Sequence, residues 1–162
     1  MLGGNITSFD APPGSNILGS ISGNPSGPPP SINPAGAIAG TYVDPSGVEH
    51  GFVRTPDGTF TTIDFPGAFS TEVLAINPAG EIVGDFSNAV TFFQGFMRTP
   101  DGTFTVINAN AGIPSGINPA GAITGGAVDG SGGYLRSPDG AVYDRPAAAL
   151  FEEQRRVVGR LF

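Results

Sequence analysis

Three arginines at one recurring position are the first candidates for chemistry in this chain. Each follows a Gly-aromatic-apolar triplet and precedes a turn containing Pro-Asp-Gly. They are Arg54, Arg98 and Arg136. A guanidinium group offers a planar fork of donors that suits carboxylates and sulfates, so a row of arginines could bind an anionic ligand. The alternative, which we favour, is that each arginine pairs with the aspartate of its own turn: Asp57, Asp101 or Asp139.

Phenylalanines in connecting segments are the second set of candidates. Phe65 and Phe69 lie in the segment that leads from the first repeated unit to the second, and Phe93 lies in a turn of the second unit. Exposed aromatic rings stack on sugars, so these three residues predict a glycan site between units. Packing between units explains the same rings at least as well.

The sequence predicts no catalytic residue, no metal site and no cofactor. His50 is the single histidine, and its neighbour Glu49 should point to the opposite face of a strand, so we expect an exposed histidine at a strand edge. The chain has no cysteine, which excludes thiol catalysis and cysteine zinc sites. Asp10 and Asp64 share one position of the repeat, but Asn108 replaces them in the next unit, which argues against an acid–base pair.

Composition limits the partners. The net charge is −7 and the chain has no lysine, so we expect neither nucleic acid nor an anionic membrane surface as a partner. No apolar run approaches the roughly 20 residues of a membrane helix, and we expect no membrane insertion. Residues 1–5 lack the charged and apolar regions of a signal peptide. A hydrophobic fraction of 39% with twelve Phe indicates a folded chain, despite 26 Gly and 16 Pro.

The candidate residues are positioned by a unit that occurs three times. Its first box, Ile-Asn-Pro-Ala-Gly, begins at Ile32, Ile76 and Ile117. Each box is followed by Ile-x-Gly, and then by the Gly-aromatic-apolar-Arg motif and its turn. Proline fixes φ early in a turn and glycine accepts the left-handed position that ends it. The spacing therefore predicts a four-stranded antiparallel meander in each unit.

The units predict an all-β chain that resembles an incomplete β-propeller. Four strands in about 40–45 residues match a propeller blade, with a β-solenoid as the alternative. The expected parts are residues 1–21, the last strand of a preceding blade with its link; 22–30, a Pro/Gly/Ser-rich linker; 31–72, 73–115 and 116–146, the three repeats; and 147–162, a short amphipathic helix. Three blades and one extra N-terminal strand cannot close a ring of at least four blades. We therefore expect self-association, as a homo-oligomer or through ring completion, unless the chain is part of a longer propeller or its open ends are covered.

At these residues the chain resembles the HAF repeat, a bacterial β-repeat family of the extracellular space. The matching pieces are the Ile-Asn-x-x-Gly-x-Ile-x-Gly box, the triplet His50-Gly51-Phe52, and the stretch from Pro56 to Ala68. The later copies carry Gln94 and Gly132 in place of the histidine. The resemblance implies an extracellular or cell-surface location, and it implies no established reaction or cofactor.

Two functions are consistent with the sequence. The first is a non-enzymatic structural or interaction module of a secreted or surface protein, self-assembling through its incomplete blades. The second is a glycan-binding, propeller-like lectin assembled from several subunits.

Overall fold

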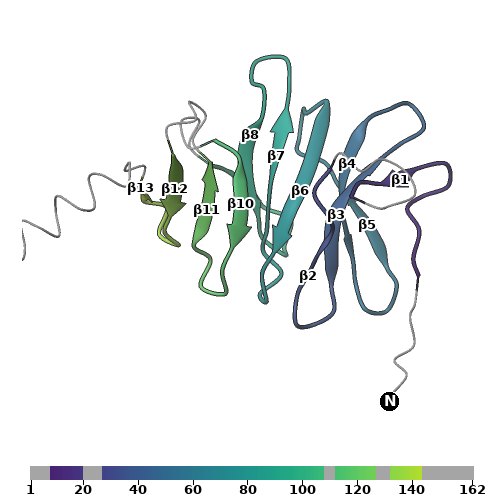
Figure 1. Ribbon diagram of the computed structural model, residues 1–162, viewed down its shortest axis with the longest axis horizontal. Helices are drawn as coiled ribbons and strands as arrows, with labels where there is room; N and C mark the ends of the chain where they lie inside the picture. The colour runs from purple at the N-terminus through teal and green to yellow at the C-terminus, as the bar shows by residue number, and fades with distance from the viewer. Residues whose placement is uncertain (1–7, 20–26, 108–111, 127–131, 144–162) are drawn as a thin grey trace, which may run out of the picture.

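The computed structural model describes residues 8–19, 27–107, 112–126 and 132–143, which contain thirteen strands (Figure 1). The strands form three antiparallel sheets, so the predicted all-β class is confirmed. These ranges include no helix long and apolar enough to cross a membrane. The helix predicted at 147–162 lies outside the described residues.

Each sheet is built from strands in chain order. The first contains β1 (Asn16–Ile17), β2 (Ser31–Ile32), β3 (Ile38–Val43), β4 (Glu49–Arg54) and β5 (Phe60–Ile63). The second contains β6 (Ser70–Ile76), β7 (Ile82–Ser87), β8 (Gln94–Arg98) and β9 (Phe104–Val106). The third contains β10 (Pro114–Ile117), β11 (Ile123–Gly126), β12 (Gly133–Arg136) and β13 (Val142–Tyr143).

The first strand position of the first sheet is divided between two segments. Both β1 and β2 pair with β3, where the second sheet has the single strand β6. The division falls where β6 and β10 each carry a bulge, at Leu74 and Ser115. The sequence predicts segment 22–30 as a linker between blades. In the structure, the strands before and after it, β1 and β2, instead occupy one strand position of the same sheet. Residues 8–10, part of the predicted extra strand, are not in a strand.

The proline–glycine turns have the same backbone in all three sheets. The last glycine of each Asn-Pro-Ala-Gly turn has φ of 83°, in the left-handed region that a Cβ disfavours. These glycines are Gly36, Gly80 and Gly121. The amide of each donates to the main-chain oxygen of the turn's asparagine at 2.9–3.0 Å. The shared turn gives the first hairpin of each sheet the same geometry.

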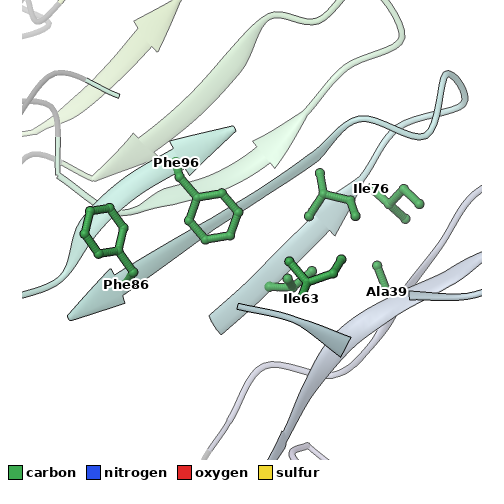
Figure 2. Packing of buried hydrophobic residues seen from close by; sticks show 7 residues of the cluster. Ala39, Ile63, Ile76, Phe86 and Phe96 are labelled. Carbon is green, nitrogen blue, oxygen red and sulfur yellow. The ribbon is translucent and has the colours of Figure 1, made fainter. Parts of the chain in front are cut away.

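The sheets pack face to face in chain order. Ala39 and Ile63 of the first sheet meet Ile76, Phe86 and Phe96 of the second in one core cluster (Figure 2). A second cluster joins the second sheet to the third and contains Val83, Ile107, Ile123 and Tyr134. Because side chains alternate along β7, Ile82 and Phe86 face the first sheet and Val83 faces the third. The second sheet is therefore covered on both faces.

An aromatic ring covers a glycine in each sheet. Gly84 is the cross-strand partner of Phe96, and a Cβ on Gly84 would lie 2.9 Å from Cζ of that ring and would overlap the main-chain oxygen of Glu72. The pairs Gly40–Phe52 and Gly125–Tyr134 have the same arrangement. This close approach explains why the glycine of Ile-x-Gly and the aromatic residue of the later motif recur together.

Candidate functional site

A ladder of asparagine side chains joins the three sheets. The Asn33 side-chain amide donates to the main-chain oxygen of Asn77 at 3.2 Å, and the Asn77 amide donates to the main-chain oxygen of Asn118 at 3.2 Å. Each asparagine Oδ1 meanwhile accepts from an amide of its own turn, on Ala37, Glu81 or Ala122. One residue type therefore closes a hairpin and also fixes its distance to the next sheet.

A second polar contact crosses the interface of the first two sheets. Thr41 Oγ1 accepts from the amide of Val73 at 2.9 Å and donates to the Val73 oxygen at 3.4 Å. Asp85 occupies the corresponding place in the second sheet, since both residues follow the glycine of Ile-x-Gly. The residue that takes the place of Val73 is Pro114, which has no N–H to donate. The Thr41 contact therefore cannot recur at Asp85.

Asp85 is only 3% exposed, and its cross-strand partner is Glu72. Burial raises the pKa of Asp85 to about 7, and the charges of Glu72 and Glu49 add to the effect. Burial also raises the pKa of Glu72, with Glu49 contributing. The interface with the third sheet thus holds a carboxyl group that titrates near neutral pH.

A shallow cavity of about 250 Å³ opens beside His50 at the start of β4. Its lining residues are Val48, Glu49, His50, Asp64 and the segment 65–71. His50 Nδ1 lies 2.8 Å from Asp64 Oδ1, and its ring stacks on Tyr42 with centroids 5.1 Å apart. Ser70 Oγ donates to Glu49 Oε2 at 2.8 Å across the same cavity. The cavity combines polar groups with the exposed ring of Phe69.

The expectation of an exposed histidine at a strand edge is wrong, because His50 is half-buried and β4 is paired on both sides, with β3 and β5. Besides Asp64, His50 has Asp44 near it, with 3.5 Å between Nε2 and Oδ2. The pKa of Asp44 is lowered to about 2, first by the Val48 amide and then by Ser46, with a smaller effect of His50. Strand register could have revealed the Asp64 contact, because Gly51 beside His50 pairs with Ile63 beside Asp64. No group of three or more His, Asp or Glu among the described residues is arranged to hold a metal ion.

The structure separates the three predicted phenylalanines. Phe65 stacks on Phe86 with ring centroids 3.7 Å apart and so belongs to the packing between sheets. Phe69 is 66% exposed and lines the cavity. Phe93 is also exposed and has a positive φ of 54° in the turn between β7 and β8. Phe69 and Phe93 approach each other at Ser87, since their amides bond its main-chain oxygen and its Oγ, respectively.

The arginines lie one to a sheet and do not share a pocket in the described structure. Arg54 and Arg98 each donate to the main-chain oxygen of the next residue at 3.4 Å. Their guanidinium groups lie over the rings of Phe9 and Phe104, at 5.2 and 5.7 Å. Nη1 of Arg136 is buried without a hydrogen-bond partner in the described part of the chain.

The predicted ion pairs between these arginines and their turn aspartates are absent among the described residues. The aspartates bond within their own turns instead. Asp57 accepts from the hydroxyl of Thr55 and the amide of Thr59, and Asp101 and Asp139 make equivalent bonds. These hydrogen bonds lower the pKa of all three carboxyl groups.

Comparison with models of known protein families and with curated proteins finds no match to this chain. Function is therefore inferred from the contacts described above.

Proposed function

We propose that this chain is a non-enzymatic structural and interaction module, built as a propeller-like stack of sheets. The observation that carries the proposal is the asparagine ladder, in which Asn33 and Asn77 bond one sheet to the next. The glycines and aromatic rings that recur with these asparagines also serve packing. The recurring residues thus build a scaffold, as expected when each repeat is stabilised by its neighbours.

The order of the sheets supports the propeller-like arrangement. Each sheet is a meander, and the segment 64–69 leads from the last strand of the first sheet to the first strand of the second. Propeller blades are connected in this way. The resemblance to the HAF repeat supports a secreted or cell-surface location.

The scaffold role is tested by comparing recurring residues with residues of the cavity. We expect Asn33→Ala and Gly40→Ala to lower the free energy of unfolding measured in urea. His50→Gln and Phe69→Ala should change it by less than about 1 kcal/mol, since the Phe69 ring is mostly exposed and glutamine keeps a hydrogen-bonding amide at the half-buried position 50. Equal stability of all four variants would show that the recurring residues do not build the scaffold.

The cavity beside His50 favours glycan binding as a second candidate function. The exposed ring of Phe69 offers an apolar platform, and His50, Asp64 and Ser70 offer polar partners within the same lining. Sugars are bound by this combination of a ring face and hydrogen bonds. Calorimetric titration with neutral and acidic oligosaccharides tests it, with Phe69→Ala expected to abolish binding and Val90→Ala, exposed elsewhere, as the control. No heat of binding from either class of sugar would exclude this candidate.

A further inference from the structure

Among the described residues the third sheet is the last, and it lacks contacts that each of the first two sheets makes with the sheet after it. Gly51 is so close to the second sheet that an added Cβ would lie 2.6 Å from Cγ2 of Val73, and Gly95 stands in the same relation to Pro114. Gly133 is the third member of this set, and it is exposed. Asn118 likewise bonds its own turn through Oδ1, but its side-chain amide donates to no described residue. Gly133 and Asn118 therefore lie where the corresponding residues of the first two sheets contact the next sheet.

The outer face of the third sheet includes Leu135. Ile123 and Tyr134 point into the core shared with the second sheet, so their strand neighbours Thr124 and Leu135 point away from it. Leu135 is 45% exposed, whereas its counterparts in the first two sheets pack against the following sheet. Those counterparts are Val53 and Met97.

The first sheet presents the other half of the same interface. Ile32 is 67% exposed, whereas its counterpart Ile76 is 8% exposed under the first sheet. Among the described residues, the main-chain oxygen of Asn33 accepts from Gly36 alone, whereas the oxygens of Asn77 and Asn118 also accept from the asparagine side chain of the preceding sheet.

The described contact of the N-terminal segment with the first sheet, made by Phe9, leaves Ile32 exposed. Phe9 lies against Phe52 with centroids 6.2 Å apart, much as Phe65 lies 5.9 Å from Phe96 in the second sheet. In the second sheet, Phe65 packs against the same core cluster as residues of the preceding sheet. The N-terminal covering of the first sheet is therefore compatible with a docked sheet.

We propose that a second copy of this chain docks head to tail, with the third sheet of one copy against the first sheet of the next. This inference rests on the proposed function and names its partner. The chain already forms this type of interface twice, between its first and second sheets and between its second and third. A first sheet of another copy is therefore the partner that fits the third sheet. The side-chain amide of Asn118 would donate to the Asn33 oxygen of the next copy, and Leu135 would cover Ile32. Such a heterologous contact leads to a closed ring or to a filament.

Two charge variants of the full chain test the docking by complementation. Leu135→Glu removes the third-sheet half of the contact and leaves the first-sheet half, and Ile32→Glu does the reverse. We expect the unmodified chain to form oligomers in sedimentation or light scattering, and each variant alone to have the mass of one chain, 16.4 kDa. A mixture of the two should give a dimer, because one functional half of each kind remains.

Val106→Glu and Val90→Glu are the matched controls. Val106 is 45% exposed, as Leu135 is, but lies on the last strand of the second sheet, and Val90 is exposed in the turn between β7 and β8. Both controls should keep the oligomer, and circular dichroism should show that every variant is folded.

An unmodified chain that is monomeric would overturn the docking. The docking would also be wrong if residues 144–162 covered the third sheet of their own chain. In that case Leu135→Glu would lower the stability without changing the mass. A mixture of variants that stays monomeric would also overturn it, because a symmetric dimer or a different partner protein cannot be complemented in this way. Failure of the docking leaves the scaffold role intact, since that role is judged by the stabilities of Asn33→Ala and Gly40→Ala.

Discussion

The side-chain amide of Asn77 reaches across the sheet interface to the main-chain oxygen of Asn118 at 3.2 Å. Asn77 is buried, and its amide also donates to Glu81 Oε2 at 2.6 Å while its Oδ1 accepts from the Glu81 amide. A buried amide with all these partners stabilises a single relative position of two sheets, because each alternative leaves polar groups without partners.

Asn77→Ala should therefore destabilise the chain far more than Asn118→Ala. Asn77→Ala removes three hydrogen bonds made by a buried side chain, so we expect the free energy of unfolding to fall by about 2–3 kcal/mol. Asn118 is exposed, and among the described residues its side chain bonds amides of its own turn, so Asn118→Ala should cost about 1 kcal/mol or less. Urea unfolding followed by circular dichroism measures both, at concentrations low enough to keep single chains. Equal losses would show that the contact between sheets contributes nothing.

Gly84→Ala should be among the most damaging single methyl additions in this chain. The new Cβ would overlap the main-chain oxygen of Glu72 and lie 2.9 Å from the Phe96 ring, and the overlapping main-chain atom cannot rotate away. We expect a loss of about 3 kcal/mol or more in the free energy of unfolding. Gly126→Ala is the control, because its Cβ would meet no atom within 4 Å and its φ is not positive. The control should be neutral or slightly stabilising, since alanine restricts the unfolded chain.

The sequence is sufficient to predict the all-β class, because proline–glycine turns and apolar strands are local features. The turn glycines, such as Gly36 and Gly80, have the expected positive φ. The sequence does not predict that β1 and β2 share one strand position, because their pairing with β3 depends on residues that follow them in the chain. The three arginines also look alike in sequence, but their predicted partners are engaged by neighbouring hydroxyl groups in the folded turns.

Phe65 and Phe69 show where a residue pattern stops being informative. Both lie in the same connecting segment, yet one ring is stacked against Phe86 and the other faces solvent. The difference depends on how residues 64–69 cross the second sheet. Composition does not contain this information, so a glycan site at Phe65 and one at Phe69 were equally consistent with the sequence.

Phe65→Ala and Phe69→Ala should separate these roles experimentally. Phe65→Ala removes a ring that contacts Phe86, Phe96 and Phe104, and we expect the free energy of unfolding to fall by about 2–4 kcal/mol. Phe69→Ala should change it by about 0.5 kcal/mol or less, because its ring is mostly exposed. Thermal and urea unfolding provide the comparison. A large loss for Phe69→Ala would mean that its ring packs against the protein in solution.

Asp85 should make the chain less stable as the pH rises through neutrality. Its folded pKa is raised from the ordinary value of an aspartate, 3.8, to about 7, first by burial and then by the charges of Glu72 and Glu49. The folded state therefore holds a proton that the unfolded chain has released between these pH values, so stability is greatest below pH 4 for this group and is lost as pH approaches 7. We expect the free energy of unfolding to fall by up to about 3 kcal/mol between pH 5 and pH 8.

Asp85→Asn should remove most of this slope and stabilise the chain at pH 8, leaving the smaller effect of Glu72, whose pKa is also raised. Asp57→Asn is the control, since the pKa of Asp57 is lowered and its contribution changes only in more acidic solution. A wild-type stability that stays constant or rises from pH 5 to pH 8 would show that Asp85 is ionised in the folded interface.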